Sequence, residues 1–376
     1  MNAQKRKEPA KRERLLSLDM MRGLAVMGMI LVNSMAGMEG EGKVFPTLLH
    51  SRWDGLTLAD VVFPMFLMMV GVSIPLSLRN ANGLSGEESR RILWRTFRLV
   101  LLGWILSNFW WVQDFSASSW RLFGVLQRIG LVYGACAFLF LMCSPRTRLI
   151  IAALILILYW PLSLLPALDG LPNDIWQRGH NFVASVDRVL LGAGHHNYVQ
   201  GPEGYDPEGL LGTLPAIAHG LIGVAVGEYL SLRGAATDRR LAIAGAAMLA
   251  AGIGWGFIFP VIKDIWSSSF VLVTCGISIL TLALLHWIYD RGQPLDGVRK
   301  VAAFIVLPFG VNAIAAYVLH EVSGSVLGWD LLLQPYRMAS GAVGPELAAF
   351  IPVAMYIFGI WLAMYYLWKK RWIIKI

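Results

Sequence analysis

Residues 46–78 read PTLLHSRWDGLTLADVVFPMFLMMVGVSIPLSL, and this stretch decides the fold. It begins with polar residues around His50 and continues as an apolar run of about twenty residues, long enough for a helix across a bilayer. Asp60 lies near the start of this run, and Pro64 and Pro75 interrupt it. A proline inside a helix leaves an earlier carbonyl without its donor, and hydrocarbon offers no replacement. We therefore expect a protein-lined cavity beside the first part of this helix, with His50 at its mouth.

The composition of the whole chain matches that stretch. Hydrophobic residues make up 56% of the 376 residues, charged residues only 15%, and the mean hydropathy is +0.59. A chain of soluble domains would carry more charge on its surface. The sequence predicts an all-α, polytopic membrane helix bundle, with a basic cytoplasmic tail (1–14) before a single transmembrane domain (15–376). We expect about ten transmembrane helices, near residues 17–37, 57–78, 92–112, 122–142, 147–166, 211–231, 240–260, 268–290, 300–321 and 346–368.

The placement of basic residues predicts the orientation of this bundle. With the N-terminus in the cytoplasm, the cytoplasmic segments hold 24 of the 32 Lys and Arg residues and the outer segments hold seven. Such a bias places both termini in the cytoplasm of a cell (inner) membrane protein. His50 and the long loop 167–210 then face outward. Because membrane orientation accounts for the net charge of +8, we expect no nucleic acid partner.

Cysteine and histidine spacing adds little. The three cysteines all lie in or directly beside apolar spans, without paired extracellular spacing, so no disulfide framework is expected. The pair His195–His196 lacks a supporting carboxylate pattern, and we expect no metal site.

His50 and its acidic neighbours form the first candidate site. A histidine can take a proton or carry an acyl group, although an interfacial histidine that binds a headgroup or the backbone is an alternative. Asp60 follows Thr57 by three residues, which fits a helix capping box. The same carboxylate can orient His50, and Asp54 is its rival for that role.

Arg128 is the most informative charge inside a predicted span. It follows Gln127 in LFGVLQRIGLVYG, and buried charges in membranes usually face a cavity or a partner. Two interpretations stay open, namely binding of an anionic ligand or an ion pair with Asp60 or Asp114. Asn33, near the end of the first span, can cap that helix or donate to a ligand.

Three further groups of polar residues lie at or inside the later spans. Glu208 belongs to the segment 205–215, whose acids suit a helix N-terminus or sugar hydroxyls. Ser268 lies in a run of three serines that can cap the next helix or meet a ligand. Asn312 lies deep in the ninth span and forms either an interhelical hydrogen bond or a ligand contact.

Several of these segments resemble the membrane domain of heparan-α-glucosaminide N-acetyltransferases and their bacterial relatives. The matching segments are Ser17–Gly23, Leu31–Asn33, His50–Pro64, Gly124–Arg128, Tyr205–Pro215, Trp266–Val273 and Phe309–Ala313. They are spread over most of the chain, and the segment His50–Pro64 is the most specific of them.

The resemblance implies a transmembrane acyltransferase that moves an acetyl group from acetyl-CoA to an amino sugar across the membrane. It implies His50 as the catalytic base or acetyl acceptor, with Asn33 and Arg128 in the same pocket. Around them we place Asp60 as a further catalytic residue, Gln127 and Ser268 with the donor, and Trp53, Asp54, Glu208 and Asn312 with the acceptor. We also consider a homodimer. The alternative function is an inner-membrane permease for N-acetylglucosamine or related sugars.

Overall fold

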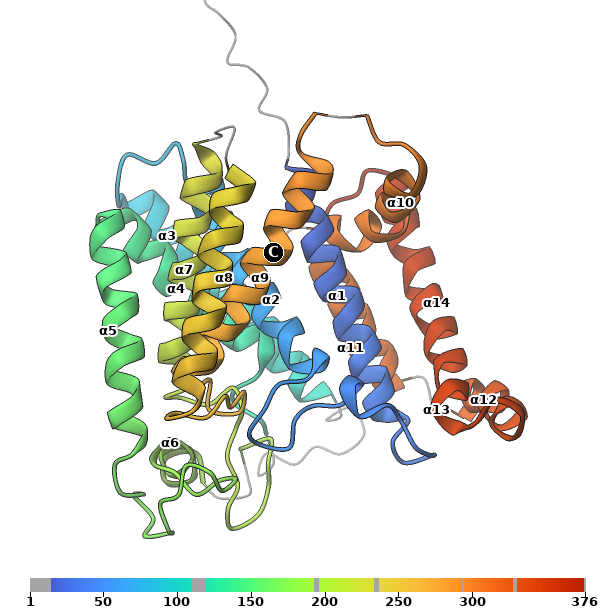
Figure 1. The fold of residues 1–376 in the computed structure, drawn as a ribbon, viewed down its shortest axis with the longest axis horizontal. Coiled ribbons are helices and arrows are strands. Elements are labelled where there is room, and N and C mark those ends of the chain that lie inside the picture. The colour runs from blue at the N-terminus through green and yellow to red at the C-terminus, as the bar shows by residue number, and fades with distance from the viewer. Residues whose placement is uncertain are drawn as a thin grey trace, which may run out of the picture.

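In the computed structural model, residues 15–109, 120–192, 196–232, 237–292, 294–326 and 330–374 are described. The regular elements within them are helices, and most of the long ones run side by side in a bundle (Figure 1). This confirms the all-α prediction. The long helices are α1 (Leu16–Gly37), α2 (Leu58–Ser77), α3 (Gly86–Ser107), α4 (Val125–Met142), α5 (Pro145–Ser163), α7 (Thr213–Ser231), α8 (Thr237–Gly256), α9 (Ser268–Tyr289), α10 (Gly297–Val311), α11 (Ala313–Val326), α12 (Asp330–Val343) and α14 (Phe350–Lys369). The shorter ones are η1 (Pro46–Leu48), α6 (Phe182–Asp187), η4 (Arg188–Gly192) and α13 (Pro345–Ala348).

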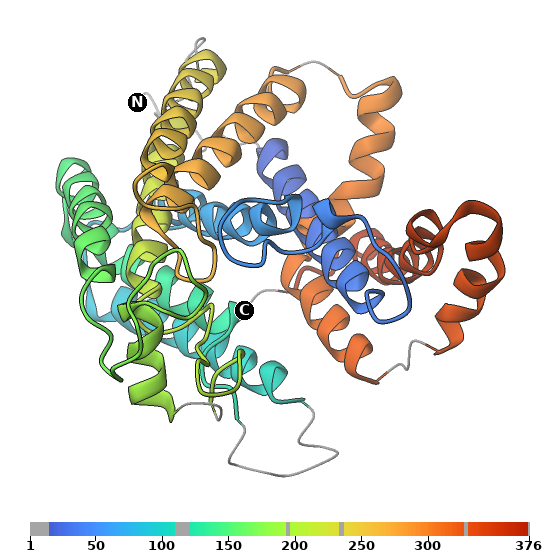
Figure 2. The same ribbon diagram turned by 60° about the horizontal axis from the view of Figure 1, so that its bottom comes forward.

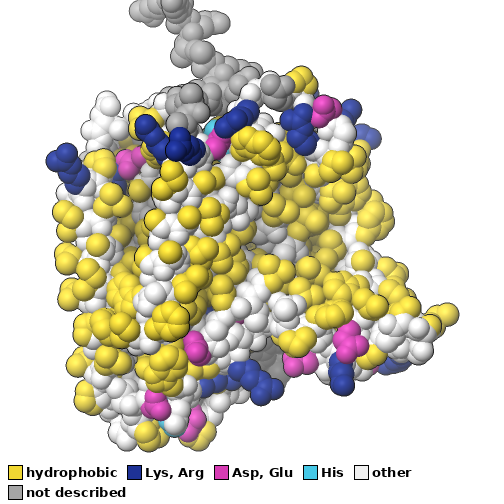
Figure 3. Space-filling model, in the orientation of Figure 1, with side chains coloured by type: hydrophobic (Ala, Val, Ile, Leu, Met, Phe, Trp, Pro, Cys, Tyr) yellow, Lys and Arg dark blue, Asp and Glu magenta, His cyan; other side chains and the backbone are white. Residues whose placement is uncertain are grey.

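Length and hydropathy identify most of the long helices as membrane spans. Within the described residues, seven helical segments qualify, and α10 with α11 adds an eighth if that bent pair is one span. Helices α3 and α8, of 22 and 20 residues, lie in the same bundle, so about ten crossing helices remain plausible. Figure 3 shows a broad hydrophobic band between two ends where charged side chains gather. A polytopic membrane protein is thereby confirmed, whereas its orientation stays a prediction.

Helix α2 lies at the centre of the bundle, in contact with α1, α4, α7 and α9. It continues through Pro64 and Pro75 without a break. Its closest approach to α7 is at Gly71, where an added Cβ would lie 2.2 Å from the carbonyl oxygen of Gly220. Small residues therefore let the two backbones touch, as is common in membrane helix pairs.

The ninth predicted span, 300–321, is not one straight helix. Helix α10 ends at Val311, and α11 leaves it at an angle of 77° after Asn312. The Asn312 amide donates to the carbonyl of Trp372 at 3.0 Å and accepts from the amide of Ile374 at 3.0 Å. The single helix expected near 300–321 is therefore broken at Asn312, where the chain turns and binds its own C-terminal segment, although α10 and α11 together still qualify as one bent span. That segment, residues 371–374, returns from α14 toward the middle of the molecule (Figures 1 and 2).

Candidate functional site

Two loops at one end of the bundle hold His50, and we call this the His50 end. The loop before α2 contains His50, and the loop between α8 and α9 lies against it. The amide of Gly55 donates to the carbonyl of Val261 at 3.0 Å, and Asp54 pairs with Ile262 as an isolated antiparallel bridge. Asp54 thus contributes to this contact through its backbone.

Asp60 at the start of α2 binds His50 directly. Its Oδ1 lies 2.8 Å from Nδ1 of His50, and Oδ2 accepts from the amides of Ser51 (3.1 Å) and Thr57 (3.0 Å). The predicted capping box between Thr57 and Asp60 is present. One carboxylate therefore performs both roles that the sequence left open, the cap and the contact with the imidazole.

The same contact assigns the proton on the ring. Because an ionised carboxylate only accepts, the contact with Asp60 favours the tautomer that carries its proton on Nδ1 of His50. Nε2 then holds the free lone pair. The imidazole side chain is 43% exposed while Asp60 is fully buried, so the ring can be reached from outside the bundle.

Lys263, which no sequence motif indicates, is the third member of this group. Its Nζ lies 3.1 Å from Nδ1 of His50 and 3.8 Å from Oδ1 of Asp60, and its side chain is only 15% exposed. The contact with His50 spans 213 residues of sequence, so no local motif indicates it. The sequence feature that could have indicated Lys263 is its position just before the serine run Ser267–Ser269, because those serines fix the conformation of the loop. Ser267 Oγ accepts from the amide of Ile262 at 3.0 Å.

A second charged cluster lies at the same end, and the sequence indicates only its acids in the segment 205–215. Arg121 donates from Nε and Nη2 to the two oxygens of Asp206 at 2.8 Å each, and from Nη2 to Glu208 at 2.5 Å. Burial alone would raise the pKa of Glu208, but the charges of Arg121, Arg128 and Lys263 lower it below its ordinary value. Glu208 is thus held as a carboxylate between three cations.

Asp187 organises the backbone of this cluster. One of its oxygens accepts from the amide of Leu210 at 3.0 Å. Burial raises the pKa of Asp187 to about 7. This carboxyl group therefore titrates near neutral pH, beside the segment that carries Glu208.

Arg128 is completely buried in α4. Its Nη2 donates to the carbonyl of Gly209 at 3.2 Å, and its guanidinium lies over the Trp266 ring at 5.0 Å from the ring centre. The expected pairing partner Asp60 is bound by His50 and Lys263 instead, and the other, Asp114, lies outside the described residues. Within the described chain, Nε and Nη1 of Arg128 have no hydrogen-bond partner. The ligand-binding interpretation of Arg128 stays a prediction.

The remaining predicted site residues are placed as follows. Ser268 donates to a backbone carbonyl of α5 at 2.6 Å, and the Trp53 indole donates to a backbone carbonyl in the loop 167–210 at 2.9 Å. Gln127 is buried beside Arg128, and Asn33 is exposed on α1 with its amide 3.4 Å from His320. Ser268 and Trp53 therefore have protein partners in this conformation, and their ligand roles stay predictions.

A cavity of about 630 Å³ opens at the opposite end of the bundle, which we call the arginine end. Along α2 its lining extends from Ser77 to Phe66, roughly 16 Å at the helical rise per residue. Its walls combine apolar side chains with three arginines and one carboxylate, and they include the C-terminal segment; the residues that we use below are Asp19, Arg22, Arg79, Arg95, Ile373 and Ile374. The cavity therefore reaches from one face of the molecule toward the interior near α4.

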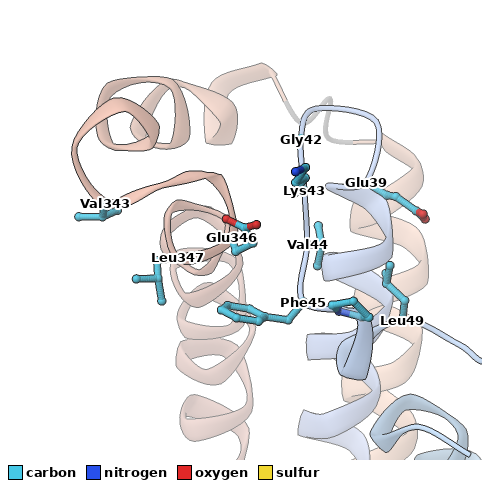
Figure 4. Close-up of a pocket in the computed structure, with 10 residues that line it drawn as sticks. Glu39, Gly42, Lys43, Val44, Phe45, Leu49, Val343, Glu346 and Leu347 are labelled. Atoms are coloured by element: carbon cyan, nitrogen blue, oxygen red, sulfur yellow. The ribbon is translucent and has the colours of Figure 1, made fainter.

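A groove of about 660 Å³ lies at the His50 end. Lys43, Phe45 and Leu49 line it from the loop after α1, and Glu346 and Leu347 line it from α13 on the facing side (Figure 4). Leu49 directly precedes His50. The lining includes neither His50 nor a residue of α2, so the cavity expected beside the first part of this helix, with His50 at its mouth, stays a prediction.

Comparison with known proteins supports the resemblance that the motifs predict. Residues 14–180 match the family model described as "Heparan-alpha-glucosaminide N-acetyltransferase, catalytic". Over 365 aligned positions the chain is 30% identical to the heparan-alpha-glucosaminide N-acetyltransferase of Homo sapiens and 29% identical to that of Mus musculus. This chain is similar to heparan-α-glucosaminide N-acetyltransferases over most of its own length. Each alignment covers 82% of this chain and 53% of the relative, so the chain spans about half the length of the curated relatives it matches.

The match to the N-acetyltransferase family model covers only part of the site. It contains His50, Asp60 and Arg128, whereas Lys263 and Glu208 lie beyond its last matched residue. Within the described residues, no group of three or more His, Cys, Asp or Glu side chains is arranged to hold a metal ion. The candidate site is thus an imidazole, a carboxylate and an ammonium group at one end, with a basic cavity at the other.

Proposed function

We propose that this protein is a transmembrane acetyltransferase that moves an acetyl group from acetyl-CoA to the amine of an amino sugar. The observation that carries the proposal is the His50–Asp60 pair, which leaves a basic Nε2 accessible at the end of the bundle opposite the arginine-lined cavity. The name of the similar human and mouse proteins, which specifies N-acetyl transfer to a glucosaminide, supports the same chemistry.

His50 can act in two ways with the same lone pair. As a base, Nε2 takes the proton from the amine while the amine nitrogen attacks the thioester carbon; the C–S bond then breaks, and the CoA thiolate takes that proton from Nε2 and leaves as the thiol. As a nucleophile, Nε2 forms the N–C bond itself, CoA leaves as its thiolate, and the amine then displaces the imidazole. In both routes the buried Asp60 stabilises the imidazolium that forms. Asn33 is proposed to polarise the thioester carbonyl.

The arginine end suits the donor. The head group of acetyl-CoA carries several negative charges and cannot cross hydrocarbon unaided. Arg22, Arg79 and Arg95 outnumber the single carboxylate, Asp19, in the cavity lining. Guanidinium groups bind phosphate well because their planar donors match its oxygens. We propose that the head group binds here, on the predicted cytoplasmic side, and that the acetyl-bearing arm extends into the bundle.

The test is direct transfer by the purified protein in lipid nanodiscs. Acetyl-CoA and glucosamine are added, and free CoA thiol and N-acetylglucosamine are measured together. We expect equal amounts of both products and a loss of roughly 10³-fold in His50→Ala, within the range for a positioned general base. His180→Ala is the matched control, since His180 pairs with Glu203 in the outer loop. Full activity in His50→Ala would refute the assignment.

The bent helix pair favours one other function. Discontinuous helices often form substrate sites in secondary transporters, and α10 and α11 meet at 77°. A sugar permease would take up labelled N-acetylglucosamine into proteoliposomes that contain no acetyl-CoA. Uptake under these conditions, with no acetyl transfer by the same preparation, would establish the permease and overturn the acetyltransferase.

A further inference from the structure

We propose that Lys263 is a positioning residue that keeps the His50 imidazole neutral, while the bond to Asp60 holds the ring proton on Nδ1 and leaves the lone pair on Nε2. The role of a neutral imidazole rests on the proposed function, whereas the effect of Lys263 on the protonation of the His50 ring does not. Lys263 acts through His50 and Asp60, and it belongs to a different loop from either of them.

The geometry around Nδ1 permits only one productive arrangement. Asp60 Oδ1 and Lys263 Nζ lie 2.8 and 3.1 Å from the same ring nitrogen. An ammonium only donates and an ionised carboxylate only accepts, so Nδ1 cannot bond to both at once. If Lys263 donated to Nδ1, the ring proton would lie on Nε2 and the exposed lone pair would be lost. With Nδ1 donating to Asp60, Lys263 instead pairs with that carboxylate at 3.8 Å.

The charge of Lys263 then decides the protonation state. A buried carboxylate beside a histidine favours the imidazolium, which would already hold a proton on Nε2. A cation at 3.1 Å disfavours the same imidazolium. Lys263 therefore offsets Asp60, and the pair leaves the ring free to accept a proton or an acetyl group.

The other charges around this group are accounted for. Asp264 and Glu208 both lie within electrostatic range of Lys263. Glu208 is bound by Arg121, and Asp264 accepts from the Tyr205 hydroxyl at 2.5 Å. Between η1 and α2 the charged side chains are Arg52 and Asp54, and neither forms a hydrogen bond or ion pair with the ring within the described residues. Among the described residues, Asp60 and Lys263 are thus the two charged groups in direct contact with the imidazole.

The loop between α8 and α9 holds Lys263 in a fixed position. Trp266 adopts φ +54°, a conformation that is costly for a bulky residue. Its amide donates to the carbonyl of Lys263 at 2.9 Å, which closes the turn. The amide of Gly55 on the His50 loop donates to Val261 two residues before Lys263. A tight turn and a cross-loop hydrogen bond therefore fix the lysine against the ring.

The experiment measures the protonation of His50 without requiring activity. Wild type, Lys263→Met, Lys263→Gln and Lys263→Arg are treated with diethyl pyrocarbonate, which modifies unprotonated imidazole, at pH 5 to 9. Modification of the His50 peptide is quantified by mass spectrometry, with the His180 peptide as an internal reference. We expect the midpoint for His50 to rise by about one pH unit or more in both neutral variants and to stay near wild type in Lys263→Arg. The His180 midpoint should not move in any of them.

Acetyl transfer provides the second readout. At pH 7 the neutral variants should lose about tenfold relative to wild type, and the deficit should close by pH 9, because the base regains its lone pair there. A purely structural role would give a deficit that is independent of pH. An unchanged His50 midpoint in Lys263→Met and Lys263→Gln, each eluting as folded protein, would overturn the inference. A shifted midpoint in a protein that transfers no acetyl would uphold it and reject the proposed function.

Discussion

The two ends of this bundle treat charge in opposite ways. At the His50 end, the charged groups around the imidazole are buried and bonded to one another, as in His50–Asp60–Lys263 and Arg121–Asp206–Glu208. At the arginine end, three arginines and one carboxylate line an open cavity. Even there Arg22 pairs with Asp19 at 3.3 Å, but the single carboxylate cannot balance all three cations.

This difference indicates a division of labour. A bond-making step needs an imidazole whose proton and orientation are set in advance, and a network of buried partners provides that. Binding a flexible, anionic donor needs accessible charge and adaptable walls. The comparison therefore predicts that substitutions at the His50 end affect turnover or stability, and that substitutions at the arginine end affect donor affinity.

The largest expected effect at the His50 end is that of Asp60→Asn. The oxygen facing Ser51 and Thr57 must accept their amides, so the asparagine carbonyl takes that place and its NH₂ faces Nδ1 of His50. That group donates, which forces the ring proton onto Nε2 and removes the base. We expect turnover to fall roughly 10²- to 10⁴-fold, as in hydrolases whose histidine adopts the wrong tautomer. The helix cap should persist, with a change in Tm of only a few degrees.

Thr57→Ala is the control for Asp60→Asn. It removes the hydroxyl from the cap and keeps the carboxylate, so we expect about 1 kcal/mol less stability and nearly normal turnover. If Asp60→Asn kept more than a tenth of wild-type turnover, the carboxylate would be only a cap.

Arg121→Met should cause the largest loss of stability. It leaves Asp206 and Glu208 buried without the guanidinium that binds both, and such losses cost about 3–5 kcal/mol. Thermal unfolding in detergent measures it. Arg178→Met is the control, because Arg178 is 53% exposed and lies 3.9 Å from Asp264, so its removal should cost less than about 1 kcal/mol. Equal losses of thermal stability in Arg121→Met and Arg178→Met would show that the buried Arg121 cluster contributes no more than an exposed ion pair.

The sequence predicts the local parts of both ends and misses the parts that depend on distant contacts. The capping box at Thr57 and Asp60 and the membrane helices follow from residues close in sequence. Lys263 reaches His50 across 213 residues. No helical or motif spacing encodes such a contact, which exists only after the loops of separate helices pack.

The helix break at Asn312 also depends on a distant contact, so the sequence does not predict it. An amide inside an apolar run suggests an interhelical hydrogen bond, and Asn312 does bond to another segment. Its partner is the C-terminal segment, with a bend in the same place, and neither is visible in the hydropathy of 300–321. In the same way, Arg128 was correctly expected to be buried, but its guanidinium contacts a loop carbonyl and Trp266 instead of Asp60.

Arg95→Met tests the arginine end. The Arg95 guanidinium lies over the Tyr133 ring at 4.4 Å, in the wall of the cavity. Removing one charge from the proposed donor site should raise KM for acetyl-CoA about tenfold with little change in kcat, equivalent to about 1.4 kcal/mol. Arg91→Met, on the same helix but 59% exposed and paired with Glu87, is the matched control and should leave KM unchanged. A fall in kcat alone for Arg95→Met would contradict the division between the two ends.

The smallest expected effect concerns the C-terminal segment in the cavity wall. Asn312→Ala removes two hydrogen bonds of 3.0 Å that hold residues 372 and 374 beside the cavity. We expect a loss of about 1 kcal/mol in stability, because exchange with water offsets most of each bond. Carboxypeptidase should then trim the C-terminus faster, as followed by intact mass, and KM for acetyl-CoA should fall by up to about threefold as the wall loosens. Ser325→Ala, which removes a hydroxyl contact within α11, is the control. If trimming accelerates in Asn312→Ala while KM rises, the segment is part of the donor site; if KM falls, it competes with the donor for the same space.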